Sequence, residues 1–260
     1  MTHSNKWRPL IYVWTALVLF FLMLPLLVVI PISFSSASYL QFPPPQWSLR
    51  WYQAFFNDPV WIDAAIRSTK IAIAATTLAT IVGTMLAFSL VRGNFTGRAA
   101  ISQFASTPII VPTIIYAVAI NGAFAKLRLI GEWYGIALAH AVLAIPYVVL
   151  IVSAALRTVD PALEQAAAGL GASQLTAIRR ITLPLIRPAM ISGMFLAFIS
   201  SFDELVVAMF LGGANVTLPK KMFDNIVNAI DPTIAAVSVL EVALWSGPHF
   251  TGEAAVGFRH

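Results

Sequence analysis

Residues 160–188 decide the fold, and they read DPALEQAAAGLGASQLTAIRRITLPLIRP. Asp160 followed by Pro161 predicts a helix start, because a carboxylate can cap free backbone N–H groups and proline fits the first turn, where its missing donor is not needed. Gly169 and Gly171 predict the end of this helix, since glycine adopts the left-handed conformation without a side-chain clash.

A second short helix is expected after the glycines. Ser173 can cap its start, and we expect it to end at Pro184, because proline removes a helical hydrogen bond. The first helix carries an apolar face of mostly small residues, suited to close approach by another surface, at Leu163, Ala166, Ala167 and Leu170. The whole stretch therefore predicts a compact helix-turn-helix.

On both sides of this stretch lie apolar runs. A membrane-spanning helix needs about 20 apolar residues, and five runs satisfy that length: residues 10–35, 71–91, 102–125, 133–156 and 185–211. A sixth, 232–248, is marginal: its 17 residues give a helix of about 25 Å, short of a roughly 30 Å hydrocarbon core. We expect a C-terminus that is altered or truncated relative to related proteins, because the sequence from residue 246 onward has no membrane character.

Composition predicts an all-α integral membrane protein, a polytopic bundle of about six transmembrane helices. The 260 residues are 59% hydrophobic and 10% charged, against about a quarter charged in soluble domains. Spanning chains must close their hydrogen bonds within helices or closed barrels, and strand-like alternation is missing from the apolar runs. The 16 Lys and Arg residues are scattered near the ends of these runs, which favours anchoring beside a lipid bilayer and excludes a nucleic-acid partner.

The first apolar run is interpreted as a retained helix. A cleaved signal peptide has an apolar region of about 7 to 15 residues, whereas no charge occurs between Arg8 and Arg50. We expect the N-terminus and residues 160–188 on the cytoplasmic side. The segment 36–66, rich in proline and aromatic residues, is expected to be external or interfacial.

The stretch 160–188 resembles the cytoplasmic coupling loop of permease subunits from binding-protein-dependent ABC importers. Their pattern is Glu-Ala-Ala, three residues, Gly, nine residues, Ile-x-Leu-Pro, and it is matched here by Ala166, Ala167, Gly171, Ile181, Leu183 and Pro184. Gln165 occupies the glutamate position, and Glu164 stands one place earlier. This departure leaves the helix-turn-helix shape intact.

The resemblance implies a type I (MetI-like) permease fold, with residues 1–260 as a single transmembrane domain and 158–187 as its coupling loop. It also implies multi-pass insertion in the bacterial inner (plasma) membrane. The partners it implies are an ATP-binding subunit dimer, a second homologous permease and a periplasmic or extracellular substrate-binding protein.

Nothing in the sequence predicts catalysis, a metal or a cofactor. The phosphate-binding run G-x-x-x-x-G-K-[ST] is missing, so we expect ATP to be bound and hydrolysed by a separate subunit. The four histidines include no pair at the ligand spacing i, i+4. The chain is therefore interpreted as a transport subunit and not as an enzyme.

Four further segments resemble the second permease of spermidine or putrescine importers: HAVLAIPYVV from His140, SFDELVVAMF from Ser201, TLPK from Thr217 and DPTIAAVS from Asp231. Relatives in this branch handle opines and aminophosphonates, so these solutes are alternatives to a polyamine.

Ionisable groups inside a membrane usually face a cavity or a partner. Asp203 and Glu204 are expected in the fifth helix, pointing about 100 degrees apart, so that one lines the translocation path and the other forms a pair. An equally open interpretation is that both carboxylates fix helix packing. His140 could contact substrate or bond across an interface, and Trp133 and Tyr134 could stack on an alkylammonium ligand or anchor the interface.

Two other function classes stay open. A secondary transporter would usually show internal repeats and broken helices in matching halves, and neither is clear in the sequence. A purely structural or assembly subunit would need no ATP-binding partner.

Overall fold

The computed structural model describes residues 7–228 and 231–253. Regular structure in these residues is helical, apart from one isolated antiparallel bridge between Ser35 and Trp47. The chain divides into two compact units, residues 1–62 with 222–260, and residues 63–221. The prediction of an all-α fold is confirmed.

The first unit contains α1 (Arg8–Ser33), α2 (Arg50–Asn57) and α12 (Thr233–Glu253), with α12 in contact with both of the others. Between α1 and α2, the Trp51 indole N–H donates to the Ala37 carbonyl at 3.1 Å. The Ser33 and Tyr52 hydroxyls lie 2.8 Å apart. The aromatic segment predicted from its proline and tryptophan content is therefore ordered by its own polar contacts.

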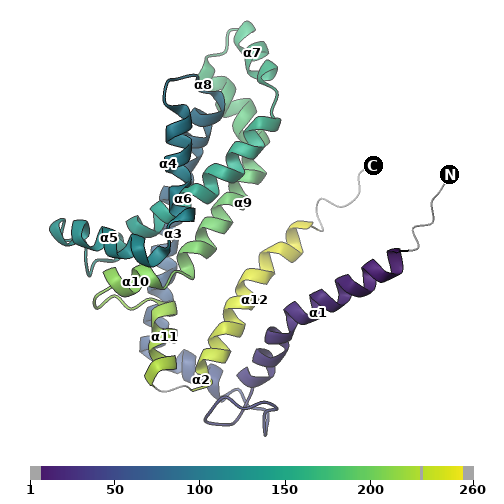
Figure 1. The fold of residues 1–260 in the computed structure, drawn as a ribbon, viewed down its shortest axis with the longest axis vertical. Helices are drawn as coiled ribbons and strands as arrows, with labels where there is room; N and C mark the ends of the chain where they lie inside the picture. The colour runs from purple at the N-terminus through teal and green to yellow at the C-terminus, as the bar shows by residue number, and fades with distance from the viewer. Residues whose placement is uncertain (1–6, 229–230, 254–260) are drawn as a thin grey trace. The chain divides into compact units, whose positions relative to one another are not determined.

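The second unit is a helical bundle with a helix-turn-helix at one end (Figure 1). Its elements are α3 (Pro59–Arg92), which begins in the first unit, α4 (Arg98–Ile110), α5 (Thr113–Lys126), α6 (Trp133–Thr158), α7 (Pro161–Gly169), α8 (Gln174–Ala177), a π-helical turn (Ile178–Thr182), α9 (Leu183–Phe202) and α10 (Val206–Leu211). Helix α11 (Leu218–Asn228) begins in this unit and ends in the first.

The core of this unit lies where α3, α6 and α9 meet around Val148, which is fully buried. A Cβ added to Gly83 of α3 would lie only 2.8 Å from the Val148 Cβ, and one added to Gly193 of α9 would lie 3.5 Å from the Val148 Cα. Small residues allow membrane helices to approach this closely. Close approach matters because lipid tails are as apolar as the side chains, so van der Waals packing, and not the hydrophobic effect, holds the helices together.

In the described part of the chain, four helices are long and apolar enough to cross a bilayer: Leu10–Ser33, Pro59–Arg92, Trp133–Thr158 and Gln174–Phe202. The third predicted run, 102–125, does not form one continuous helix, because it is divided between α4 and α5, which are bent by 107° at a break. Val111 before Pro112 is extended (ψ 128°), the conformation that a following proline imposes. The pair α4 and α5 is therefore a broken span or a re-entrant loop.

Two predicted helix ends also need correction. The helix after Ser173 does not end at Pro184, because the π-helical turn carries it into α9, and the Leu183 N–H donates to the Ile178 carbonyl. Such local π adjustments re-satisfy backbone groups near proline in membrane helices. The predicted run 185–211 is not one helix either, because α9 ends at Phe202 and α10 begins at Val206.

The predicted sixth helix is present and longer than expected. Helix α12 continues through Glu241 to Glu253, although its apolar part, Thr233–Ser246, is shorter than a full span. Residues 254–260, on which the prediction of an altered terminus partly depends, lie outside the described residues.

Candidate coupling loop and polar centre

The ends of helix α7 are built as the sequence predicts. The Asp160 carboxylate accepts the Ala162 N–H at 2.9 Å, and Pro161 occupies the first turn. After the helix, Gly171 has φ +86°, a left-handed conformation that L side chains adopt at a cost of about 1 kcal/mol or more. The Ser173 hydroxyl then accepts the Thr176 N–H at 3.3 Å and caps α8. Both caps and the glycine turn are confirmed.

The turn between α7 and α8 presents apolar side chains to the outside. Leu170 is 91% exposed and Leu175 73% exposed, and no residue of α7 is buried. A nine-residue helix with no buried face has little stability of its own in water, because nucleation is costly. This exposed surface, with Leu170 and Leu175 on either side of Gly171, is suited to a protein partner.

Glu164 ties α7 to the bundle. Its Oε1 lies 3.4 Å from the Arg92 Nε at the end of α3 and accepts the Thr182 hydroxyl at 2.7 Å. Arg92 also donates through Nη2 to the Val159 carbonyl at 2.8 Å, just after α6. One carboxylate therefore connects three segments that are distant in sequence, and we call Glu164, Arg92 and Thr182 the latch.

The remaining motif residues divide by exposure. Gln165 and Ala166 are exposed and Ala167 half-buried on α7. Ile181 is half-buried in the π-helical turn, and Leu183 packs against the core of α3, α6 and α9. The end of the motif, Leu183 and Pro184, forms the start of α9.

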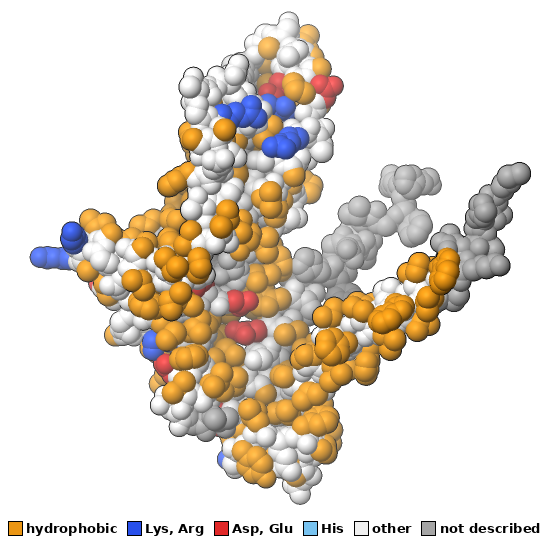
Figure 2. All heavy atoms as spheres, in the orientation of Figure 1, with side chains coloured by type: hydrophobic (Ala, Val, Ile, Leu, Met, Phe, Trp, Pro, Cys, Tyr) orange, Lys and Arg blue, Asp and Glu red, His pale blue; other side chains and the backbone are white. Residues whose placement is uncertain are grey.

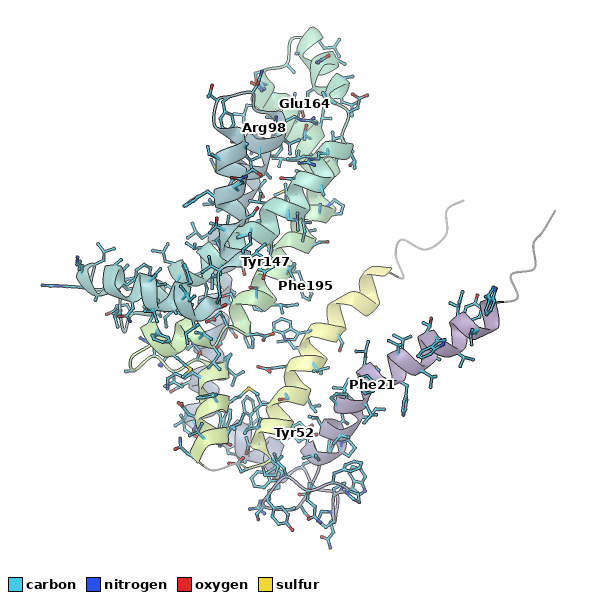
Figure 3. All side chains as sticks on the ribbon, viewed as in Figure 1. Phe21, Tyr52, Arg98, Tyr147, Glu164 and Phe195 are labelled. Atoms are coloured by element: carbon cyan, nitrogen blue, oxygen red, sulfur yellow. The ribbon has the colours of Figure 1, made fainter. Side chains whose placement is uncertain are left out.

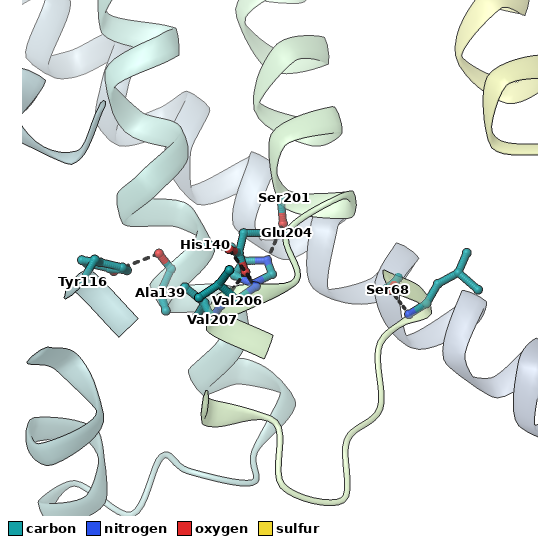
Figure 4. A network of polar contacts seen from close by, with 9 residues as sticks. Ser68, Tyr116, Ala139, His140, Ser201, Glu204, Val206 and Val207 are labelled. Atoms are coloured by element: carbon teal, nitrogen blue, oxygen red, sulfur yellow. Dashed lines mark hydrogen bonds and ion pairs between the residues drawn. The ribbon is translucent and has the colours of Figure 1, made fainter. Parts of the chain in front are cut away.

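A polar centre lies where α9 gives way to α10 (Figure 4). Glu204 is outside both helices, and its two carboxylate oxygens accept the N–H groups of Val206 at 3.1 Å and Val207 at 2.7 Å. A carboxylate that accepts these backbone N–H groups replaces the carbonyl oxygens that would accept them in a continuous helix. The sequence prediction that Glu204 sits within the fifth helix was therefore wrong, and the residue itself supplies the physical reason for the break.

His140 of α6 completes this centre. Its Nε2 lies 3.5 Å from the Glu204 Oε2, its Nδ1 lies 3.0 Å from the Ser201 hydroxyl, and the residue is 2% exposed. On the preceding residue, the Ala139 carbonyl accepts the Tyr116 hydroxyl of α5 at 3.0 Å. Helices α6 and α9 thus meet at one half-buried carboxylate, and α5 is bonded to α6 at the residue beside His140. No local pattern in the sequence predicts that Ser201 and Tyr116 take part in these contacts.

The other candidate path residues lie elsewhere. Asp203, at the end of α9, is exposed and outside this network. Tyr134 and Trp133 begin α6, about two helical turns before His140. The Trp133 ring is in T-shaped contact with Tyr134, and the Lys70 ammonium lies 3.7 Å from its centroid. The aromatic pair therefore already holds a cation of this chain, and the five predicted path residues do not form one site.

These features define a class: a polytopic helical membrane protein with a capped helix-turn-helix between two of its spans. Among the described residues, there is no group of three or more His, Asp or Glu arranged to hold a metal ion.

Residues 79–245 match the family of the binding-protein-dependent transport system inner membrane component, and the chain belongs to this family. It is thus a permease component of an inner-membrane transport system.

Relatives with known roles cover most of the chain. The spermidine/putrescine transport system permease protein PotC of Haemophilus influenzae is 34% identical over 86% of this chain and 87% of that protein. The putrescine transport system permease protein PotI of Escherichia coli is 36% identical over 85% of this chain and 81% of that protein.

The fold also matches a solved structure. In the crystal structure of a bacterial ABC transporter involved in the import of the acidic polysaccharide alginate, one chain superposes with a TM-score of 0.71. The two chains are 16% identical, and the match covers 97% of this chain and 99% of that one. The MetI-like permease fold predicted from the sequence is confirmed.

Proposed function

We propose that this chain forms half of the translocation pathway of an ATP-driven importer for a small cationic solute, namely a polyamine such as spermidine or putrescine. The observation that carries the proposal is the capped α7 helix, which is joined through its flanking segments to the spans α6 and α9. The identity with polyamine permeases over more than 80% of each chain supports the solute class.

The loop 158–187, within a single permease domain of residues 1–260, couples the membrane helices to the ATP-binding subunits. Leu170 and Leu175 contact the groove of that subunit, and Gly171 sets the sharp turn between them. Glu164 holds α7 against the bundle, while Gln165, Ala166 and Ala167 belong to the docking surface. Ile181, Leu183 and Pro184 carry movement of this loop into α9, which they begin or directly precede.

The polar centre suits passage of a cation. Glu204 provides a half-buried negative charge between α6, α9 and α10, and exposed Asp203 stands next to it. A carboxylate beside the path attracts an alkylammonium group, and its bonds to His140 and the α10 N–H groups keep this attraction weak enough for release. At the other site, Trp133 and Tyr134 offer a ring face to a solute ammonium that displaces Lys70.

The complete importer in this proposal contains an ATP-binding subunit dimer, a second homologous permease and an external substrate-binding protein. An opine or an aminophosphonate is the alternative solute, because related permeases of this branch carry such compounds. A secondary transporter is the less favoured class: the broken pair α4 and α5 fits it, but the exposed α7 helix would then have no partner.

Reconstitution in proteoliposomes tests the proposal. The chain is combined with the ATP-binding subunit, second permease and binding protein encoded beside it, and ATP-dependent uptake of labelled spermidine and putrescine is measured. We expect Gly171→Val to abolish uptake, because a β-branched residue does not readily adopt φ +86°. Gly122→Ala should preserve uptake, because Gly122 lies inside helix α5 and a Cβ there meets no atom within 4 Å. Uptake of only an opine or aminophosphonate would overturn the solute, and uptake driven by an ion gradient without the ATP-binding subunit would overturn the class.

A further inference from the structure

A third polar feature lies apart from the latch and the polar centre. A cavity of about 480 Å³ opens between α4 and α6, near the end of α3. Its lining includes two guanidinium groups, Arg98 and Arg157, and three hydroxyl groups, Ser102, Ser106 and Ser153. The proposed function makes no use of this cavity.

Both arginines are free to bind an external anion. They are exposed, and within residues 7–228 and 231–253 no carboxylate lies within ion-pair distance of either. Arg98 makes one long bond, from Nη1 to the Gly93 carbonyl at 3.4 Å. By contrast, nearby Arg92 is neutralised by Glu164 at 3.4 Å. The fold therefore pairs one of these cations internally and leaves two beside the cavity.

Unused hydrogen-bonding groups also border the cavity. The Ser153 hydroxyl is buried and has no hydrogen-bond partner in the described part of the chain. Helix α4 begins at Arg98 after Gly97, which provides no side-chain cap, so its first N–H groups are available. A buried hydroxyl and the free N–H groups at the start of a helix can both donate hydrogen bonds to a phosphate oxygen.

The position of the cavity relates it to the lipid. Arg157 lies one residue before the end of α6, and Arg98 is the first residue of α4, close to the end of the bundle that carries Glu164 (Figure 3). Figure 2 shows Lys and Arg side chains gathered at this end, next to apolar side chains further along the bundle. Leu150 and Ile109 line the cavity and are exposed, so they extend an apolar surface from it.

We propose that this cavity binds the headgroup of an anionic phospholipid in the leaflet on the coupling-loop side. The phosphate lies between the Arg98 and Arg157 guanidinium groups and accepts the Ser153 hydroxyl, and an acyl chain follows Leu150 and Ile109 along the helices. Basic pockets between membrane helices hold such headgroups because charge and apolar surface are both matched. The proposal is independent of the solute, because it uses none of the latch or polar-centre residues.

Photolabelling tests this site. The assembled importer is placed in phosphatidylcholine vesicles that contain a small fraction of photoactivatable phosphatidylglycerol, and labelled peptides are identified by mass spectrometry. We expect label in peptides from α4 and the second half of α6. In Arg98→Gln/Arg157→Gln the labelling should fall about thirtyfold, equivalent to about 2 kcal/mol for two basic side chains. Ser153→Ala should lower it severalfold without any change of charge.

The matched control is Lys126→Gln/Arg128→Gln, which removes the same charge from exposed positions at the end of α5 and should leave labelling unchanged. Assembly is checked by size-exclusion chromatography, so that a misfolded variant is recognised. Equal labelling of both double variants would overturn the proposal. Absence of label from the α4 and α6 peptides, with inorganic phosphate held at the site instead, would also overturn it, because the site would then take free phosphate and not lipid.

Discussion

Replacing Glu164 with glutamine should loosen helix α7 even when no partner subunit is present. The substitution keeps an oxygen that can accept the Thr182 hydroxyl at 2.7 Å but removes the negative charge that faces Arg92. Arg92 then keeps only its bond to the Val159 carbonyl. Helix α7, which buries no residue of its own, loses a main connection to the bundle.

The size of the effect follows from the geometry. The Arg92 and Glu164 side chains are 20% and 16% exposed, so the pair is largely shielded from solvent. Removing the carboxylate leaves the Arg92 charge without a partner and only partly solvated. Breaking a fully buried ion pair costs about 3 to 5 kcal/mol and an exposed pair contributes about 0 to 1 kcal/mol, and this largely shielded pair lies between the two cases. Taking about 2 kcal/mol, the opening of α7 should become roughly thirtyfold more frequent, since each 1.4 kcal/mol is a factor of ten.

Hydrogen–deuterium exchange mass spectrometry on the permease in lipid nanodiscs measures this opening. Amides in peptides covering residues 161–177 should exchange roughly thirtyfold faster in Glu164→Gln, whereas peptides from the middle of α6 should be unchanged. Gln165→Ala is the matched control, because Gln165 is the exposed neighbour on the same helix and lies outside the latch.

A double-mutant cycle locates the effect in the pair. Arg92→Gln alone should accelerate exchange in α7, and combining it with Glu164→Gln should add much less than the sum of the two, because both remove one interaction. Unchanged exchange in Glu164→Gln would refute the latch. Strictly additive effects would show that the two residues act separately, although they lie 3.4 Å apart.

Three further outcomes are expected. Gly83→Ala should lower the melting temperature in detergent, by a loss of about 1 to 3 kcal/mol, because the new Cβ would lie 2.8 Å from that of Val148, while Gly122→Ala should not; equal melting would contradict this packing. Glu204→Gln should reduce polyamine uptake at least tenfold with assembly intact, and uptake at the parental rate would remove Glu204 from the path. His140→Ala should destabilise the bundle by about 1 to 3 kcal/mol in a thermal shift assay, because the Ser201 hydroxyl loses its partner.

The sequence predicted elements well where the signal is local. Apolar length placed the long spans, and the Asp160 cap and Gly171 turn were predicted correctly because a cap or a left-handed turn depends on residues only a few positions apart. Breaks inside apolar runs were missed. Proline at 112 and 184 has opposite outcomes, a 107° bend in one place and a π-helical continuation in the other. Which of these occurs depends on the helices packed against the proline.

Adjacent polar residues show the same limit more sharply. At 164 and 165 the sequence offers Glu and then Gln, and at 203 and 204 Asp and then Glu; in each pair one side chain bonds to a distant helix and the other is exposed. Glu164 pairs with Arg92 and Glu204 with His140. These partners are distant in sequence, so no local rule predicts which residue of each adjacent pair is used. Under the proposed coupling role, the shift of the carboxylate from position 165 to 164 has a physical meaning: the charge serves the internal latch, and a neutral amide is left on the proposed docking surface. We therefore expect an ATP-binding subunit that docks on this loop to place no cation opposite Gln165.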